Sequence, residues 1–245
     1  KIIQTRLLDS KCPRYNKTVE PRARDTLRKL IPYIEPDAFI IVGGVAIRYL
    51  LSSRHIDYPR RPFNDLDLVT KSLDVVSRKA ADEFLVYHHH PVDSFLSLVD
   101  PLSKTKIDIF HEEGERNVER VMFDDKTIDI SSAEDQLVRT VLDVQSISAD
   151  MHRDPKWFEN MRLLAKIADM KKANEIWKSY RPQNYSENIE EVMEMSERLA
   201  KDHPEWLKEK LFRRDKPYKC EQCKNINGFD VVPMEKVYEV LGYVE

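Results

Sequence analysis

A strand that ends in two adjacent glycines is the sequence feature that most constrains the fold of this chain. The 245 residues include only five glycines, and two of them, Gly43 and Gly44, directly follow the apolar run AFIIV at 38–42. Short apolar runs rich in β-branched residues are typical of buried strands. The next segment, VAIRYLLSS at 45–53, has apolar residues at helical spacing. The sequence therefore predicts a strand, a glycine turn and a helix in direct succession.

This succession favours a phosphate site at the start of the helix. Without side chains, Gly43 and Gly44 let the backbone approach a ligand closely and take positive φ. The first N–H groups of a helix are free and carry a partial positive charge, which attracts anions. The alternative is a plain tight turn, because short glycine motifs are common.

Two carboxylates lie on the next predicted strand, DLDLVT at 65–70. Asp65 and Asp67 are two residues apart, so both side chains project from one face. Two carboxylates at this spacing repel each other unless a cation lies between them, and Mg²⁺ prefers such oxygen ligands and usually shares its shell with phosphates. The alternative is an exposed strand face that pairs with Arg60 and Arg61.

A third carboxylate, Asp108, lies between Ile107 and Ile109 in the segment KTKIDIF. If the strand at 106–110 neighbours the strand at 65–70, Asp108 can approach the first two aspartates. Three such carboxylates could hold two metal ions, which would activate an attacking oxygen and stabilise a leaving pyrophosphate. Asp108 would then be a general base or a ligand of the acceptor-side metal. The alternative is a solvated polar strand face.

The remaining elements predict an α+β domain followed by a helical domain. Alternating or apolar segments predict further strands at 94–100, 118–123 and 127–131, and a helix is expected from Ser72 onward. After residue 131 a capping signature opens a run of helical periodicity. Further helices are expected at 156–180, at 185–212 and near the C-terminus. We therefore predict three units, at 1–131, 132–215 and 216–245, the last being a tail with a C-x-x-C pair and a short helix.

Composition limits the class of protein. The chain is 41% hydrophobic and 34% charged with a net charge of −3, which indicates a globular protein with a real core and gives no global argument for nucleic-acid or membrane binding. No apolar run reaches the roughly eighteen residues that a membrane span needs. The first residues lack the apolar core of a signal peptide. Three cysteines make no disulfide framework, so a cytoplasmic location is expected.

A pair of thiols near the C-terminus has the spacing of zinc ligands. Cys220 and Cys223 form the motif CEQC, but tetrahedral zinc needs four ligands and no second cysteine pair follows. We keep both interpretations open, a zinc site and two inert, reduced cysteines.

Basic residues flank the predicted phosphate and carboxylate segments. Arg54, Arg60, Arg61 and Lys71 all lie near them in the sequence. Their positive charge would neutralise a triphosphate or a nucleic-acid acceptor. The alternative is ordinary surface charge.

The three motifs VGGVAIRYLL, RPFNDLDLV and KIDIF, in this order, resemble those of the DNA polymerase β-like nucleotidyltransferase superfamily. The resemblance implies a mixed β-sheet with flanking helices over residues 1–131. It also implies a nucleoside triphosphate (NTP) cradled by the two glycines, and two Mg²⁺ ions, or Mn²⁺ in their place, on the three aspartates. An arginine four residues before the first aspartate, here Arg61, is expected to contact phosphate or the carboxylates.

Within that superfamily, the chain looks nearest to the abortive-infection toxin-type branch, in which a Ser-Pro-Glu-Asp-Leu helix follows the core. Residues 132–137 read SAEDQL. The toxins tend to carry a lysine on this helix, and that position falls at Thr140 with Arg139 beside it, so Arg139 is a candidate nucleotide-binding residue. A later toxin element is matched by Lys156, but Glu159 and Asn160 stand near the position of its expected acid.

Two functions follow as hypotheses. The first is a metal-dependent nucleotidyltransferase that moves a nucleoside monophosphate from an NTP to an acceptor and releases pyrophosphate. The acceptor is left open among RNA, protein and a small molecule, as is the oligomeric state. The second is a non-catalytic nucleotide sensor or an antitoxin-type regulatory module that keeps the same fold.

Overall fold

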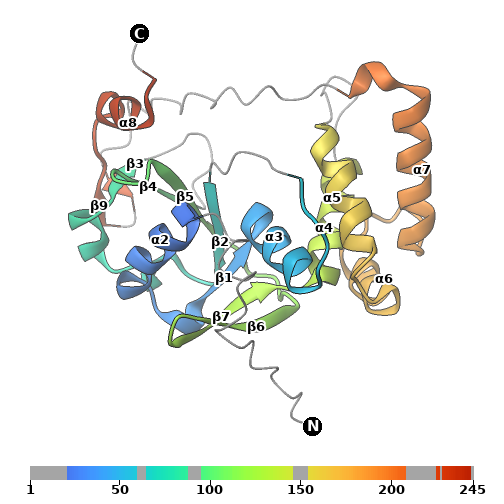
Figure 1. Ribbon diagram of the computed structural model, residues 1–245, viewed down its shortest axis with the longest axis horizontal. Helices are drawn as coiled ribbons and strands as arrows, with labels where there is room; N and C mark the ends of the chain where they lie inside the picture. The colour runs from blue at the N-terminus through green and yellow to red at the C-terminus, as the bar shows by residue number, and fades with distance from the viewer. Residues whose placement is uncertain are drawn as a thin grey trace.

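The computed structural model describes residues 21–59, 65–87, 95–145, 154–207, 225–226 and 228–243. Its centre is a seven-stranded sheet in the order β3-β4-β5-β2-β1-β7-β6, flanked by helices (Figure 1). Parallel and antiparallel pairs both occur, so the predicted α+β class with a mixed sheet is confirmed. The strands are β1 (Phe39–Val42), β2 (Asp65–Thr70), β3 (Leu85–Tyr87), β4 (Phe95–Asp100), β5 (Thr105–His111), β6 (Val118–Phe123) and β7 (Lys126–Ser131), with a separate hairpin of β8 (Asn225–Ile226) and β9 (Phe229–Asp230).

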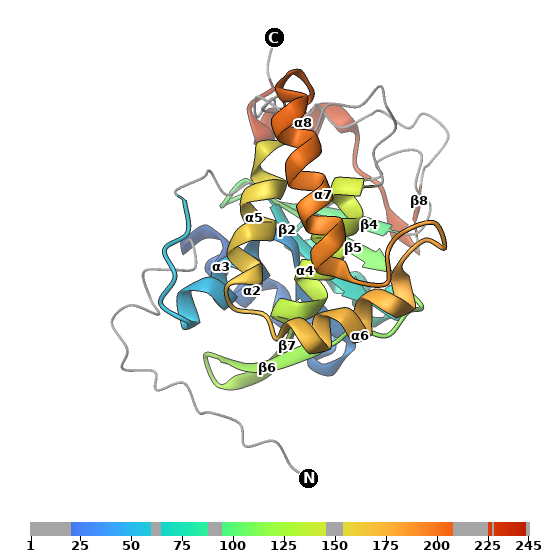
Figure 2. The ribbon, with the colours of Figure 1, turned by 90° about the vertical axis from the view of Figure 1, so that its right-hand side faces the viewer.

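Helices cover one face of the sheet and extend from its β6–β7 side as a bundle (Figures 1 and 2). The α-helices are α2 (Pro21–Leu30), α3 (Gly43–Ser53), α4 (Ala133–Gln145), α5 (Pro155–Ala165), α6 (Met170–Tyr180), α7 (Ile189–Asp202) and α8 (Met234–Leu241). Short 3₁₀ helices span Ile31–Tyr33, Pro36–Ala38, Leu73–Val75, Arg78–Asp82 and Pro204–Trp206. None of the helices in the described segments combines the length and the apolar character that crossing a membrane requires.

The core lies between the sheet and helices α2 and α3, and it continues into helices α4 to α7. Leu66 and Leu68 of β2 and Ile107 and Ile109 of β5 have no exposed surface, and they alternate along their strands with the polar residues. Burial of each such side chain contributes about 2 kcal/mol. The alternation therefore fixes the register, because a shift by one residue would place the aspartates in the core.

The expected helix from Ser72 onward is wrong. The segment instead forms two 3₁₀ helices and the strand β3. The Ser72 and Ser77 side chains accept hydrogen bonds from the backbone N–H groups of Asp74 and Lys79, so each serine begins a short turn instead of continuing a helix. The apolar residues that suggested helical periodicity pack against the sheet.

The two long helices expected in the C-terminal half are shorter than predicted. The segment 156–180 is divided into α5 and α6, because the Asp169 side chain accepts hydrogen bonds from the N–H groups of Lys171 and Lys172 and thus caps a new helix. Of the segment 185–212, residues 208–212 lie outside the described part of the chain, and in the rest α7 ends at Asp202, two residues before Pro204. No strand occurs in the described residues between 132 and 207, as expected.

The C-terminal residues 228–243 attach to the β3 edge of the sheet, where Figure 1 shows α8 beside β3 and β4. The Val232 N–H donates to the Val86 carbonyl at 2.9 Å. Gly228 has φ of +78°, and a Cβ there would lie 2.5 Å from the Arg78 guanidinium. The apolar side of α8 packs on this edge of the sheet; the cluster comprises Leu85, Tyr87, Val99, Met234, Val237 and Leu241.

A buried carboxylate at the end of β4 gives the fold a pH dependence. Asp100 has a side chain only 4% exposed and lies 3.0 Å from the Lys29 ammonium. Burial alone would raise its pKa, but hydrogen bonds from the Leu102 N–H, Lys29 and Ser103 hold that pKa below its ordinary value. A carboxylate with a lowered pKa stabilises the fold above its unfolded-state pKa and loses this contribution as the pH falls through the folded-state value.

We therefore expect Asp100→Asn to lower the free energy of unfolding at pH 7 by about 1–3 kcal/mol. The difference from wild type should shrink toward pH 3, since the unfolded-state pKa of aspartate is about 3.9. Urea denaturation at both pH values measures this, with the exposed Asp125→Asn as control. An equal loss at pH 7 and pH 3 would contradict the expectation.

Candidate functional site

Four polar side chains and the end of β1 form one row across the sheet. The strand pairing places Val42 opposite Asp67, Asp67 opposite Asp108, Asp108 opposite Ser97, and Ser97 opposite Tyr87. Residues that are directly opposite in neighbouring strands project from the same face. The row therefore lies on the face of the sheet away from the α2–α3 core.

A second row lies two residues earlier on the same face. Asp65 of β2 is directly opposite Lys106 of β5. Because β2 and β5 are adjacent and parallel, Asp65, Asp67 and Asp108 lie together on two neighbouring strands. The structure thus brings the three predicted aspartates to one place.

Gly43 holds the end of β1 against Asp67. It has φ of +64°, and a Cβ at this position would lie 2.3 Å from Asp67 Oδ2. Any other residue would be strained in its backbone and would collide with the carboxylate. Because β1 runs antiparallel to β2, this contact places the N-terminus of α3 beside Asp67.

Gly44 has a different environment. A Cβ on Gly44 would meet no heavy atom within 4 Å, so the space beside it is open. This glycine lies in the first turn of α3, where backbone N–H groups lack partners within the helix. Gly43 therefore makes room for the Asp67 carboxylate, and Gly44 leaves open space for a ligand at the N-terminus of α3.

The electrostatics of the aspartates favour a bound cation. Burial raises the pKa of Asp67 well above its ordinary value, and the charges of Asp65 and Asp108 raise it further. Burial also raises the pKa of Asp65, against the lowering effect of Lys106 and Lys156. Carboxylates that raise one another's pKa bind a divalent cation with relief of this repulsion.

The chemistry of the donors fits magnesium, which takes oxygen ligands. Across the described segments, however, no three acidic, histidine or cysteine side chains are grouped closely enough to hold a metal as they lie. Asp67 is directed toward Gly43, and Asp108 accepts a hydrogen bond from Ser97. Metal binding by the three aspartates therefore stays a prediction, and it requires the Asp67 carboxylate to turn from Gly43 toward Asp65 and Asp108.

Two lysines supply positive charge at the site. Lys106 and Lys156 both lower the pKa of Asp65 and of Asp67. Lys156 lies in the first turn of α5, which is capped by the Asp154 side chain. We did not predict Lys106 from the sequence, although a signal was present: in K-I-D at 106–108 it is two residues before Asp108 and so shares its strand face.

Lys71 is not brought to the aspartates. It follows the last residue of β2, about 20 Å along the strand from Asp65. Its ammonium donates to the backbone carbonyls of Glu113 and Gly114. These contacts hold it at the opposite end of the sheet.

Arg139 also lies at that opposite end, in a network of charged residues. Its guanidinium contacts Asp135, which has no exposed surface, at 3.1 Å, and Glu112 at 2.7 Å. Arg116 contacts the same two carboxylates at 3.0 and 2.6 Å. Glu112 directly follows β5, so this network joins α4 to the sheet, away from Asp65 and Asp67.

Of the remaining predicted basic residues and cysteines, only Arg54 lies in the described part of the chain. Arg54 forms an ion pair with Glu119 at 2.7 Å. Arg60 and Arg61, and the cysteines Cys220 and Cys223, lie outside the described residues, so phosphate binding by Arg61 and a zinc site at the cysteines stay predictions.

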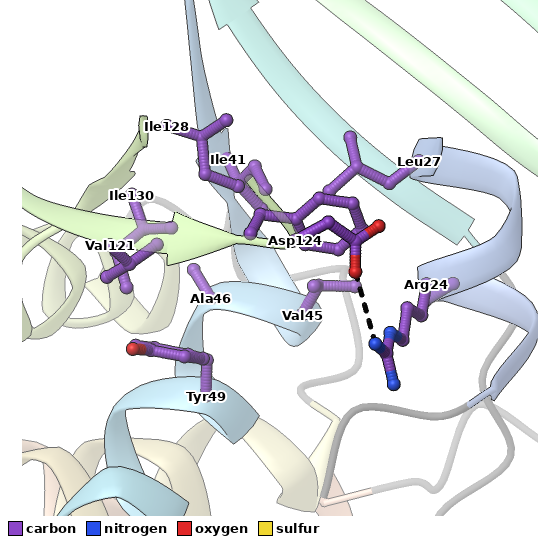
Figure 3. A pocket seen from close by; sticks show the side chains of 12 residues that line it. Arg24, Leu27, Ile41, Val45, Ala46, Tyr49, Val121, Asp124, Ile128 and Ile130 are labelled. Carbon is purple, nitrogen blue, oxygen red and sulfur yellow. Dashed lines mark hydrogen bonds and ion pairs between the residues drawn. The ribbon is translucent and has the colours of Figure 1, made fainter. Parts of the chain in front are cut away.

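A cavity on the other side of the sheet does not belong to this site. It lies between α2, α3 and strands β1, β6 and β7, beside the ion pair of Arg24 and Asp124 (Figure 3). Apolar side chains, among them Ile41, Val45 and Ile130, line a volume of about 40 Å³. Ligand pockets usually exceed about 300 Å³, so this cavity is too small for a nucleotide.

The solved structures similar to this chain include one named an adenylyltransferase and one named a nucleotidyltransferase-like protein. A lincomycin-bound lincosamide antibiotic adenylyltransferase, LnuA, shares 14% identity over 62% of this chain and 99% of its own, with a TM-score of 0.40. The antibiotic-resistance factor ANT(2'')-Ia shares 13% identity over 74% of this chain and 96% of its own, with a TM-score of 0.43. An antigenic nucleotidyltransferase-like protein from Paracoccidioides brasiliensis shares 14% over 78% and 89%, with a TM-score of 0.39.

No family model matches the chain, and no curated protein matches it. The function of the protein is therefore inferred from the residues of the candidate site.

Proposed function

We propose that this protein is a metal-dependent nucleotidyltransferase that transfers a nucleoside monophosphate from an NTP to an acceptor and releases pyrophosphate. The observation that carries the proposal is the arrangement of three carboxylates around a helix N-terminus. Asp65, Asp67 and Asp108 lie on two adjacent strands, and α3 begins beside Asp67 with open space at Gly44. This arrangement combines a place for a divalent cation with a place for phosphate.

The binding of the triphosphate is assigned to backbone and cationic groups. The free N–H groups at the start of α3 would donate to phosphate oxygens that approach over Gly44. Lys106 and Lys156 would offset the negative charge of the phosphates, as they already offset that of the aspartates. These groups position the α-phosphate for in-line attack.

The three aspartates would bind the cation, and one of them would also accept the proton that the attacking group loses. A divalent cation at this site would supply charge neutralisation and activation of the attacking oxygen. The acceptor oxygen forms a bond to the α-phosphorus while the bond from that phosphorus to the bridging oxygen breaks, and pyrophosphate leaves. Asp108, on the neighbouring strand, would take the proton from the attacking group of the acceptor.

Incubation with NTPs labelled at the α-phosphate tests this proposal. The full chain, Mg²⁺ and total RNA or protein extract should yield a labelled macromolecule or small product, and the product names the acceptor class. Label should not transfer with EDTA or with the Asp67→Asn variant. An unlabelled extract, together with thermal stabilisation by NTP that is the same with and without Mg²⁺, would contradict the enzyme and support a nucleotide sensor.

A further inference from the structure

Ser97 is a polar residue in the middle of a buried strand. It lies in β4 between Leu96 and Leu98, and none of the three has exposed surface. A buried hydroxyl costs free energy unless it is hydrogen-bonded. Its partner is the candidate site itself, since the Ser97 hydroxyl donates to Asp108 Oδ1 at 2.6 Å.

Tyr87 lies directly behind Ser97 in the same row of the sheet. Its side chain is 1% exposed. Burial and the charge of Asp108 raise the pKa of Tyr87. The Ser97 hydroxyl donates its one proton to Asp108, and Tyr87 lies beside it on the side away from that carboxylate.

The hydrogen bond from Ser97 orients the Asp108 carboxylate. With Oδ1 held by Ser97, rotation of the carboxylate is restricted, and Oδ2 is the oxygen left for a cation or for the acceptor's proton. We propose that Ser97 is a positioning residue for Asp108. This proposal rests on the proposed function, because it assigns Asp108 a role at the site.

The C-terminal residues keep water away from this pair. Tyr87 packs in the apolar cluster that contains Met234, Val237 and Leu241 of α8. In such a dry environment a hydrogen bond to a carboxylate is stronger than one exposed to water. The attachment of α8 to the β3 edge therefore supports the orientation of Asp108 from outside the site.

The affinity of the full chain for Mn²⁺, measured by the electron paramagnetic resonance signal of the free ion, tests the proposal independently of the acceptor. Loss of a side chain that orients a metal ligand typically lowers metal affinity by about 10- to 100-fold. We expect Ser97→Ala to weaken Mn²⁺ binding by about tenfold. Ser97→Thr keeps the hydroxyl and should restore the affinity. Ser196→Ala, which removes another fully buried serine hydroxyl from α7, should bind as wild type does.

Ser97→Cys gives a second, milder test, because a thiol is a much weaker hydrogen-bond donor than a hydroxyl. We expect it to weaken Mn²⁺ binding by roughly threefold to fivefold, and it carries the test if Ser97→Ala does not fold. Wild-type affinity in folded Ser97→Ala, or in folded Ser97→Cys if the alanine variant does not fold, would overturn the positioning role and leave the proposed function in place. Absence of Mn²⁺ binding by the wild type, or binding that Asp67→Asn does not change, would overturn both.

Discussion

Replacement of Asp67 by asparagine is expected to abolish nucleotidyl transfer and, at the same time, to stabilise the metal-free protein. Asp67 lies between Asp65 and Asp108 on the same sheet face and against Gly43. Loss of its charge removes a central ligand of the proposed cation, so transfer should fall by at least about 100-fold. In the absence of metal, the same change removes the repulsion among three neighbouring carboxylates.

The sign of the stability change follows from the direction of the pKa shift. Burial raises the pKa of Asp67 in the folded protein, so the fold favours the protonated carboxyl. A group with a raised folded-state pKa destabilises the fold as the pH rises through that value. Asparagine resembles the protonated form at every pH. The variant should therefore be more stable than wild type at pH 7, and the two should converge in stability as the pH falls.

Thermal denaturation in EDTA measures this gain, which should be a few degrees if it amounts to about 1–2 kcal/mol. Mg²⁺ with NTP should raise the melting temperature of wild type and of the control Asp125→Asn, but not that of Asp67→Asn. A variant that melts lower than wild type in EDTA and still transfers label would show that Asp67 serves the fold and not a cation.

Local patterns carried enough information to predict the aspartate site. Alternation on a strand has a period of two residues, so D-x-D on one face could be read directly from the sequence. The pairing of β2 with β5 could only be assumed, since nothing local specifies which strands are neighbours. Once the strand order is known, the register places Asp108 opposite Asp67 of β2 and opposite Ser97 of β4.

Non-local contacts explain what the sequence did not predict. The segment after Ser72 has an apolar spacing that suits a helix, but its residues complete the sheet edge as 3₁₀ turns and β3. Lys71 looked near the site because it is close to Asp67 in sequence, yet a strand carries its residues apart at about 3.3 Å each. Strand direction, not sequence distance, decides which charges meet the carboxylates.

The two adjacent glycines should respond to alanine in opposite ways. Gly43→Ala places a Cβ 2.3 Å from Asp67 Oδ2 and forces a non-glycine residue into a backbone with φ of +64°. The backbone alone costs about 1–2 kcal/mol, and the carboxylate has to move. We expect this variant to be less stable than wild type and to lose transfer, because Asp67 is displaced.

Gly44→Ala should leave the free energy of unfolding unchanged or raise it. The new Cβ meets no atom within 4 Å, and alanine has a higher helix propensity than glycine. The new methyl group fills the space over which phosphate is expected to approach the N–H groups of α3. We therefore expect about tenfold weaker binding of NTP with Mg²⁺, equivalent to about 1.4 kcal/mol. Calorimetric titration with each of the four NTPs, beside thermal denaturation, separates the two variants. If folded Gly44→Ala binds NTP as tightly as wild type, the phosphates do not lie at the first turn of α3. In that case the added methyl group would occupy the space beside residue 44 without touching the ligand.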